Sequence, residues 1–316
     1  MGVAKFVDIE MQQVESKLKE ALRTKNKTVE AALKQLADSG GKRLRPMLTV
    51  LGGSFGNYKS DQIVPIAAAV EIIHMATLVH DDIIDDAKLR RGTETIQSKL
   101  GKDVAVYSGD FLFSRAFMLL ADIAEINLLK DMARGVAFIC DSEIAQNEQK
   151  YNNDITVRQY LKRIGGKTAA LFAVSLAAGA HKSGCEKKLV NQLGVLGKNI
   201  GMAFQIVDDL LDFTGEQLKV GKPLFSDAKQ GIYTLPVIYA LNSRHRDTVL
   251  KALDRLTEDE GVLLREILFE GKTIDRSKRI AERYVDKALK SAAKLPERDG
   301  KQMIIDIIHK QIERKF

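Results

Sequence analysis

Tryptophan is absent from this sequence, and only five prolines and two cysteines occur among its 316 residues. Because proline interrupts helices, so small a number leaves room for long ones. The cysteines, Cys140 and Cys185, have no pairing framework and no metal-ligand spacing. These absences argue against a disulfide scaffold and a zinc site, and they favour a reducing compartment.

The N-terminus also lacks the features of a targeting segment. Its first residues, MGVAKFVDIE, have no apolar core of the kind that a signal peptide needs. Phe6 stands where N-myristoylation requires Ser or Thr. No run of about 18 uncharged apolar residues is present, so we expect no membrane span and a cytoplasmic protein.

The charge balance is basic, with a formal net charge of +7. Residues 271–316 hold 13 Lys and Arg against 7 Asp and Glu. A solvated helical face is the ordinary interpretation, and a surface attracted to anionic lipid or to a partner subunit is the alternative. Nucleic-acid binding is not expected, because the basic residues do not alternate with aromatic ones. At most, we expect peripheral contact with a membrane.

Helical periodicity runs through nearly every long segment, whereas no segment alternates with a period of two. Four segments are apolar nearly all round and are predicted to be central helices, namely 66–84, 104–123, 168–180 and 187–213. Glycine-rich or polar breaks are expected at 39–41, 52–60, 91–92, 165–166 and 214–231. No linker or repeat divides the chain. The sequence therefore predicts a single all-α domain over residues 1–316, with about ten or more helices.

The strongest local signal is a cluster of four aspartates, Asp81, Asp82, Asp85 and Asp86, at the end of the apolar segment 66–84. On a helix, Asp81 and Asp85 share one face and Asp82 and Asp86 share the next. Like charges at this spacing repel one another, and the apolar surroundings make unpaired charge more expensive still. We therefore expect a cation at this cluster.

A second cluster, Asp208, Asp209 and Asp212, ends the apolar segment 187–213. A single cluster of this kind is more often a solvated helix end than a site, but two copies in the same setting favour a shared function. Magnesium suits both, because it prefers oxygen and binds through one or two carboxylates together with substrate phosphates.

Basic residues near predicted helix ends point to anion binding. Lys42 and Arg45 follow Gly40-Gly41, and if Lys42 begins a helix the two side chains share a face at a favourable phosphate site. His74 lies two turns before Asp82, and it is either a satisfied core histidine or a ligand contact. Further cations are Arg90, Arg91, Lys167 and Lys222, and for each lysine alone solvent exposure is the simpler interpretation. Together these residues predict two anion sites, one built on carboxylates with metal and one on Lys and Arg.

From about Val14 to its C-terminus, the chain resembles the trans-isoprenyl (polyprenyl) diphosphate synthase family, in particular the catalytic subunits of long-chain bacterial enzymes. The matching stretches are GGKRLRP at 40–46, EIIHMATLVHDDIIDDAKLRRG at 71–92, GGKTAALF at 165–172 and FQIVDDLLDFTGEQLKVGKPLFSDAKQGIYTLP at 204–236. The resemblance implies a helical bundle around a deep central cavity, in which the two aspartate motifs face each other. It also implies an enzyme that condenses isopentenyl diphosphate with an allylic diphosphate.

The resemblance assigns roles residue by residue. It implies magnesium ligands at Asp81, Asp82, Asp85, Asp208, Asp209 and Asp212, with three ions when substrate is bound. It implies contacts to the allylic diphosphate from Arg90, Lys167, Thr168, Gln205 and Lys222. It implies contacts to isopentenyl diphosphate from Lys42, Arg45, His74 and Arg91. The residues implied in catalysis are Asp81, Asp82, Asp85, Lys167, Asp208 and Asp209. Arg314 is implied only loosely in closing the site.

One departure from the family pattern occurs at Gly231-Ile232-Tyr233-Thr234, where many relatives read GKxT. The lysine is missing, and Lys229 nearby is a possible substitute that we do not include among the site residues. No protein general base is evident either, and the resemblance implies that the released diphosphate removes the proton.

Product length is expected to depend on the residues that precede Asp81. One isoprene unit extends the product by roughly 5 Å, which is close to one helical turn of about 5.4 Å. Ile73, Ala76 and Thr77 therefore stand along the growing chain, and none carries an aromatic ring that would block it. We expect a product of about C30 to C40.

The resemblance implies either a homodimer or a heterodimer with a small noncatalytic subunit, and the sequence does not choose between them. Three other functions are possible. A metal-dependent phosphohydrolase using His80 and Asp81 would leave the second cluster without a role. A regulatory subunit without activity should have lost aspartates, and a terpene cyclase would not need Lys42, Arg45 and Arg91.

Overall fold

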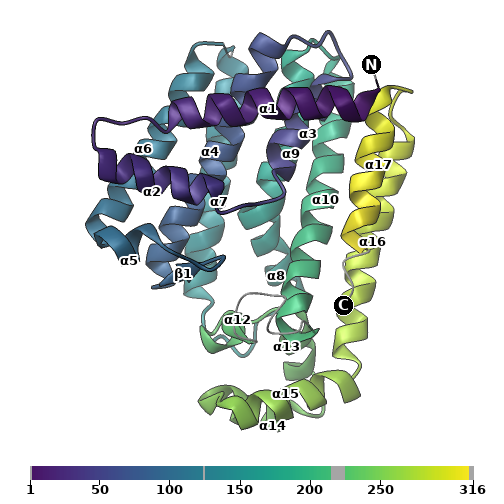
Figure 1. The fold of residues 1–316 in the computed structure, drawn as a ribbon. Coiled ribbons are helices and arrows are strands. Elements are labelled where there is room, and N and C mark those ends of the chain that lie inside the picture. The colour runs from purple at the N-terminus through teal and green to yellow at the C-terminus, as the bar shows by residue number, and fades with distance from the viewer. Residues whose placement is uncertain (1, 124, 215–224, 313–316) are drawn as a thin grey trace. The chain divides into compact units, whose positions relative to one another are not determined.

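The computed structural model describes residues 2–123, 125–214 and 225–312, and these residues are almost entirely helical (Figure 1). The prediction of an all-α protein is confirmed. The chain divides into two compact units, each assembled from separate stretches. Unit 1 comprises the described residues of 1–136, 171–197 and 295–304, and unit 2 those of 137–170, 198–294 and 305–316. That residues 1–316 form one domain stays a prediction.

The elements follow one another along the chain as consecutive helices with one small hairpin. The first half contains α1 (Val3–Ala21), α2 (Lys27–Asp38), α3 (Leu44–Gly53), α4 (Ser60–Ile84), β1 (Leu89–Arg90), β2 (Thr93–Glu94), α5 (Ile96–Leu100), α6 (Lys102–Ala121) and α7 (Ile126–Glu148). The second half contains α8 (Val157–Ile164), the π-helix η1 (Gly165–Ala169), α9 (Ala170–Lys182), α10 (Lys187–Thr214), α12 (Ser226–Lys229), α13 (Leu235–Leu241), α14 (Arg246–Arg255), α15 (Glu258–Glu270), α16 (Thr273–Ala293) and α17 (Asp299–Ile312).

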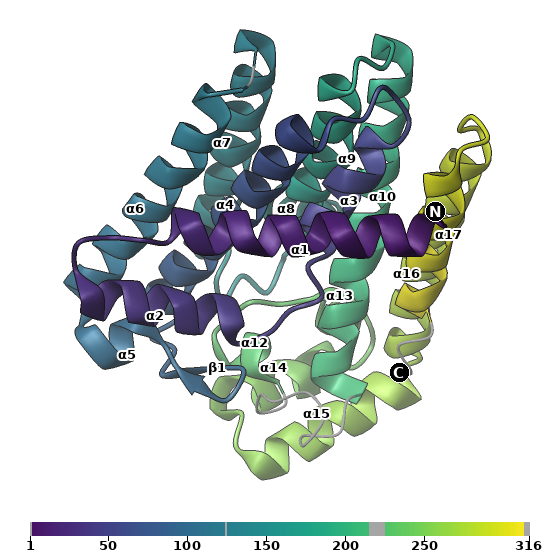
Figure 2. The same ribbon diagram turned by 45° about the horizontal axis from the view of Figure 1, so that its top comes forward.

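Unit 1 is organised around α4. Ile, Val, Ala and Met occupy most of its positions, and its buried residues run from Ile63 to Asp82 on all sides of the helix, as expected of a central helix. α6 packs along α4, and α1 lies across α3 and α4 in both ribbon views (Figures 1 and 2). The first acidic cluster therefore lies at the carboxyl end of a helix, α4, that is itself well packed.

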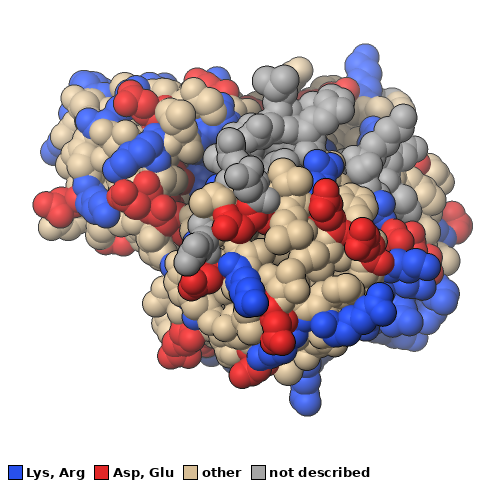
Figure 3. All heavy atoms as spheres, turned by 90° about the horizontal axis from the view of Figure 1, so that it is seen from below, with Lys and Arg blue, Asp and Glu red and all other residues tan. Residues whose placement is uncertain are grey.

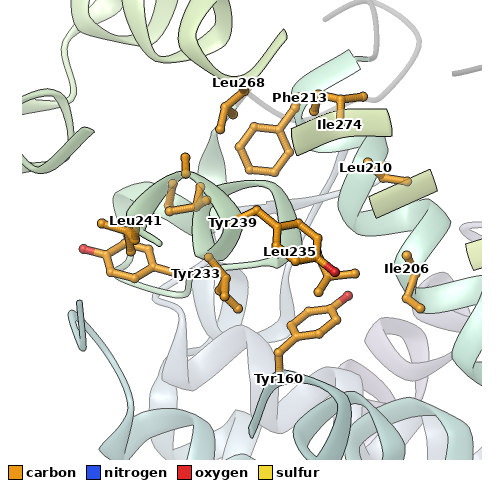
Figure 4. Packing of buried hydrophobic residues seen from close by; sticks show 14 of the residues in the cluster. Tyr160, Ile206, Leu210, Phe213, Tyr233, Leu235, Tyr239, Leu241, Leu268 and Ile274 are labelled. Atoms are coloured by element: carbon orange, nitrogen blue, oxygen red, sulfur yellow. The ribbon is translucent and has the colours of Figure 1, made fainter. Parts of the chain in front are cut away.

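Unit 2 has its own hydrophobic core around α13, in which all seven residues are buried. Residues from the end of α10 and from α15 and α16 pack against it. Figure 4 shows the Phe213 ring among Leu210, Leu268 and Ile274. This core fixes the segment that carries the second acidic cluster.

One predicted feature of the local structure was wrong. Gly165-Gly166 is not a break, because the chain passes through the π-helix η1 and continues directly into α9. The expected break at 91–92 is confirmed, and it is the turn of a hairpin between β1 and β2 that was not itself predicted. Its turn residues Arg91 and Gly92 have φ values of 52° and 78°, the paired positive values that a tight two-residue hairpin requires. The other expected breaks at 39–41 and 52–60 are confirmed, and most of 214–231 lies outside the described residues.

Among the residues that the structure describes, two helices, α4 and α6, are long and apolar enough to cross a membrane by length and composition. Core helices of soluble proteins pass the same test, and 72% of the apolar window in α4 is buried inside the fold. The corresponding share in α6 is 33%. For α4, the burial supports the interpretation as a core helix.

Candidate active site

The first acidic cluster lies at the carboxyl end of α4, in unit 1. Asp81 and Asp82 belong to the last turn, and Asp85 is the C-cap, whose backbone N–H donates to the Asp81 carbonyl at 2.9 Å. The expected helical pairing of Asp82 with Asp86 was wrong, because Asp86 has a φ of 47° and has left the helix. Its carboxylate pairs with Lys102 at 3.0 Å. The cluster that remains on the helix end is Asp81, Asp82 and Asp85.

Arg90 of the hairpin holds Asp82, whose exposed fraction is only 4%. Its Nε and Nη2 donate to the same carboxylate oxygen at 2.8 and 2.7 Å. The Gln97 amide donates to the Asp82 carbonyl at 2.7 Å and to the Ala87 carbonyl at 2.8 Å. A cation expected to contact the diphosphate therefore lies directly beside an expected metal ligand.

The stretch GGKRLRP begins its helix two residues later than we expected. Helix α3 starts at Leu44, so Lys42 lies outside it and cannot share a helical face with Arg45. Arg43 is the N-cap in the left-handed region, with φ 44°. Its guanidinium donates to Glu15 at 2.6 Å, to Glu71 at 2.8 Å and to the Ala37 carbonyl at 2.7 Å. Arg43 therefore joins this loop to α1, α2 and α4.

His74 of α4 is surrounded by positive charge. Burial and the charges of Arg45, Arg91, Arg90 and Arg43 lower the pKa of His74 well below its usual range, so that the imidazole is neutral near pH 7. The structure thus brings together three of the four residues expected to bind isopentenyl diphosphate, namely His74, Arg45 and Arg91. Lys42 is exposed, two residues before the start of α3.

This cluster of arginines is crowded. Burial, followed by the charge of Arg90, lowers the pKa of Arg91. The guanidinium carbon of Arg45 lies 4.9 Å from the centre of the Phe172 ring, which gives it a cation–π contact. Several guanidinium groups around a neutral imidazole form a ready site for an anion with many oxygens, and a diphosphate fits that description.

The second acidic cluster lies at the end of α10, in unit 2, and it is tied to α8 and η1 by side-chain hydrogen bonds. The Tyr160 hydroxyl donates to Oδ2 of Asp209 at 2.6 Å, and the Gln205 amide donates to Oδ1 at 2.7 Å. The Thr168 hydroxyl donates in turn to Oε1 of Gln205 at 2.5 Å. Arg163 stacks on Tyr160 and donates to the Tyr233 carbonyl at 2.6 Å. These contacts fix Asp209 in one orientation.

Asp209 and Asp212 are buried carboxyl groups without enough positive charge beside them. Burial, with the charge of Asp227 added, raises the pKa of each to about 7. Ser226 donates to Oδ1 of Asp212 from its backbone and its hydroxyl, both at 3.3 Å. The other oxygen, Oδ2, is buried, and no described residue bonds to it. A divalent cation would complete the coordination of that oxygen and favour the ionised form of both carboxyl groups.

The donor set fits magnesium rather than a metal held by protein ligands alone. Among the described residues, no three His, Cys, Asp or Glu side chains converge on one point. Magnesium commonly takes only one or two carboxylates and completes its shell with water and substrate phosphates. The residues present therefore suit an ion that arrives together with a diphosphate.

Lys167 lies in the π-helix η1, so its side chain leaves the helix in a different direction from that in an ordinary α-helix. Its ammonium donates to Glu143 of α7 at 2.9 Å. Gly166 allows η1 to approach α7 closely, since a Cβ there would collide with the Ser142 side chain. The expected contact of Lys167 with the allylic diphosphate would therefore replace or share an existing ion pair.

Some expected site residues are placed less fully. Lys222 and Arg314 lie outside the described residues. Ile73 and Ala76 are fully buried in α4, and the Thr77 hydroxyl donates to the His74 carbonyl at 2.8 Å. At the place of the missing family lysine, Ile232 is buried, whereas Lys229 is exposed.

Sequence reasoning missed several residues that the structure places beside expected site residues of the same unit. They are Arg43, Glu71, Glu143, Tyr160, Arg163 and Asp227. Tyr160 and Arg163 precede GGKT at a helical spacing, which was a usable signal. The partners of Arg43 and Lys167 lie 28 and 24 residues away along the chain, so no local pattern could reveal them.

With this geometry in view, comparison with known proteins identifies the class. The sequence matches the polyprenyl synthetase family over residues 26–268. It is 38% identical to heptaprenyl diphosphate synthase component 2 of Geobacillus stearothermophilus, over 96% of this chain and 95% of that protein. The structure resembles heptaprenyl diphosphate synthase of Staphylococcus aureus with a TM-score of 0.92 and 34% identity, covering 98% and 99% of the two chains.

A third relative was crystallised with bound ligands. Polyprenyl synthase of Caulobacter crescentus, in complex with calcium and isoprenyl diphosphate, has a TM-score of 0.93 and 31% identity, covering 99% of this chain and 97% of that one. The chain described here belongs to the polyprenyl synthetase family. It is a chain-elongating prenyltransferase, and its family acts on diphosphate substrates with the help of a divalent metal.

Proposed function

We propose that this enzyme condenses isopentenyl diphosphate with an allylic diphosphate, such as farnesyl diphosphate, to make an all-trans polyprenyl diphosphate of about C30 to C40. The observation that carries the proposal is that the chain has two chemically different means of holding a diphosphate. One is the pair of buried carboxyl groups, Asp209 and Asp212, whose ionised form a cation would favour. The other is the group of arginines around neutral His74.

In this proposal the aspartates bind magnesium and the allylic diphosphate, with three ions when substrate is present. The ligands are Asp81, Asp82, Asp85, Asp208, Asp209 and Asp212. Magnesium supplies positive charge that stabilises the departing diphosphate as the allylic C–O bond breaks. Arg90, Lys167, Thr168, Gln205 and Lys222 orient the same group and donate to its oxygens. Lys167 would leave Glu143 to do so.

The second substrate would be held by direct contacts alone. Arg45 and Arg91 donate to the diphosphate of isopentenyl diphosphate, and Lys42 adds a point charge. Neutral His74 can donate a hydrogen bond without adding another charge to the crowded site. The double bond of isopentenyl diphosphate then attacks the allylic carbon, and exclusion of water keeps the cation from being hydrolysed. The released diphosphate accepts the proton, so no side chain is assigned as general base.

The length of the product is proposed to depend on α4. Ala76 and Thr77 lie about one turn before Asp81 and Ile73 about two turns before it, and each turn of about 5.4 Å matches roughly one isoprene unit. None of the three side chains is large enough to stop the chain near the first turns. The names of the relatives, heptaprenyl diphosphate synthases in two cases, support a product within this range.

The proposal extends to assembly and location. The Geobacillus relative is called component 2, which supports a heterodimer with a small noncatalytic subunit, and a homodimer is the alternative. We propose a cytoplasmic enzyme. The thiols of Cys140 and Cys185 are both free, as suits a reducing compartment.

The test is incubation of the purified chain with labelled isopentenyl diphosphate, farnesyl diphosphate and Mg²⁺, followed by sizing of the product. We expect a ladder that ends between about C30 and C40, with Asp82→Ala as the inactive control. Repeating the reaction with candidate partner chains decides between the two assemblies. Release of phosphate from nucleotides without any condensation product would indicate a phosphohydrolase instead.

A further inference from the structure

The face of α16 that points away from the core carries a continuous row of cations. The buried residues of this helix share the opposite face and are Thr273, Ile274, Ser277, Ala281, Val285, Ala288 and Ala292. The cations, which we call the α16 basic row, are Lys272, Arg276, Arg279, Arg283, Lys287, Lys290 and Lys294, and all are exposed. Successive members are three or four residues apart, so they fall within an arc of about 80° around the helix. The row is about 33 Å long.

The row keeps an excess of positive charge, with seven cations against three acidic residues beside it. Three exposed acidic residues, Asp275, Glu282 and Asp286, lie along one flank of it. Each stands one residue before a row member and three or four residues from another, as Asp275 does from Lys272 and Arg279, so these carboxylates offset part of the charge of the row. No salt bridge connects a member of the row to another described residue. Several steps within the row join like charges four residues apart, and this arrangement destabilises a helix.

Apolar side chains contribute little to this surface. No large hydrophobic side chain on α16 is among the exposed ones in the described chain. Two row members cover rings, since Arg276 lies 4.0 Å from the Tyr239 ring and Lys287 lies 4.6 Å from the Tyr284 ring. In Figure 3, Lys and Arg side chains gather at the right-hand edge, the side on which α16 lies in Figure 1. A partner that binds here must be recognised by its negative charge.

We propose that the α16 basic row attaches the enzyme to a membrane surface rich in anionic lipid headgroups. A straight row of exposed cations is complementary to a flat sheet of phosphate groups, and clusters of this size bind such sheets. Nucleic acid is less suited, because no exposed aromatic ring on the row offers stacking to a base. The inference also rests on the proposed function. Transfer of a long polyprenyl chain into water is strongly unfavourable. An enzyme in contact with a bilayer could release its product directly into the lipid. Contact through charge alone should be peripheral and reversed by salt.

The test is sedimentation of the full chain with vesicles. Vesicles of phosphatidylglycerol and phosphatidylcholine in equal parts are compared with vesicles of phosphatidylcholine alone. The row variant is Arg279→Glu/Arg283→Glu/Lys290→Glu, which changes three members without ring contacts. The matched control is Lys130→Glu/Lys188→Glu/Lys198→Glu, which changes three exposed lysines elsewhere and gives the same net charge. Condensing activity is measured for all three proteins in vesicle-free buffer.

We expect the wild type and the control to bind the anionic vesicles and to be released at high salt. The row variant should bind at least about tenfold more weakly and keep its activity in solution. The proposal would be overturned if both triple variants lost vesicle binding equally. It would also be overturned if the wild type bound anionic vesicles no more strongly than neutral ones. Binding of the wild type to duplex DNA but not to anionic vesicles would also overturn it, in favour of nucleic acid. If the wild type showed no condensing activity, the proposed function would be refuted. Vesicle binding is a separate measurement and would still test the membrane proposal.

Discussion

Tyr160 and Asp209 stand 49 residues apart in the sequence, yet the Tyr160 hydroxyl donates to the Asp209 carboxylate at 2.6 Å in a fully buried contact. This hydrogen bond orients a carboxyl group whose pKa is raised to about 7 by burial and by the charge of Asp227. It explains how a carboxylate that we propose binds magnesium is kept in one position without an ion pair. The residue that holds it belongs to another helix.

Replacing Tyr160 with Phe should weaken the use of magnesium while leaving the fold in place. The variant removes one hydrogen bond to a charged group, worth about 1.5–3 kcal/mol, and retains the buried ring. We expect the Mg²⁺ concentration for half-maximal activity to rise about tenfold, as measured by magnesium titration of the condensation rate. Tyr233→Phe is the control, because it removes a hydroxyl from the same core without touching Asp209. An unchanged magnesium requirement in Tyr160→Phe would argue against this positioning role.

Arg43 should support the binding of one substrate and not the other. Its guanidinium connects the loop before α3 to Glu71, which is 5% exposed and lies three residues before His74. Arg43→Gln leaves that buried carboxylate without its cation, a change that typically costs about 3–5 kcal/mol of stability. We expect a lower melting temperature and a KM for isopentenyl diphosphate raised about tenfold, with little change in the KM for the allylic primer.

Two further variants test whether the loss of stability comes from the Arg43–Glu71 ion pair or from any change of charge. Arg43→Gln/Glu71→Gln should recover part of the lost stability, because it removes both charges together. Lys17→Gln breaks an exposed pair with Glu20 and should cost less than about 1 kcal/mol. An equal rise in both KM values in Arg43→Gln would show that Arg43 acts on the whole site.

Stability without metal should fall as the pH rises through the acidic range. Asp209 and Asp212 have pKa values of about 7 in the folded protein, against an ordinary value of 3.8. Between about pH 4 and pH 7 the folded state therefore binds more protons than the unfolded state, and the free energy of unfolding decreases with pH. Because magnesium binds the ionised carboxylates, it should raise the melting temperature more at pH 8 than at pH 5.

Melting can be followed by circular dichroism, which needs no tryptophan. The control is Asp209→Asn/Asp212→Asn, which should flatten this part of the pH dependence and remove most of the magnesium effect. A wild type stabilised by magnesium to the same extent at both pH values would contradict the assignment of these carboxyl groups.

Ala76→Tyr should shorten the product. Ala76 is fully buried in α4, about one turn before the first acidic cluster, and a tyrosine ring there would fill space proposed for the growing chain. Thin-layer or mass analysis should show products at least about one isoprene unit shorter, since one unit corresponds to one helical turn. Ala76→Ser adds a single atom and should leave the distribution unchanged. The same distribution in Ala76→Tyr would refute the proposal that these residues of α4 limit product length.

Much of the fold could be predicted because its signals are local. The apolar run of α4 and the long apolar part of α10 are visible as helical periodicity, which depends only on neighbours three and four residues away. The aspartate clusters at their ends are equally local. The family resemblance added the functional roles, and the comparisons confirm the family itself.

Other features could not be predicted because they depend on close approach between distant segments. The chain passes through η1 where a break was expected, because Gly166 packs against Ser142 of another helix. Asp86 leaves the helix, and Lys42 precedes α3, at positions where backbone conformation is set by the surrounding contacts.

The sequence by itself determined that the protein is helical, that two acidic clusters end apolar helices, and which family it belongs to. Only the tertiary structure decided which side chains hold those clusters, since Tyr160 with Asp209 and Arg43 with Glu71 meet across different helices. Periodicity and charge repulsion act over one or two turns, whereas burial and the pKa values that follow from it depend on every segment that packs around a group.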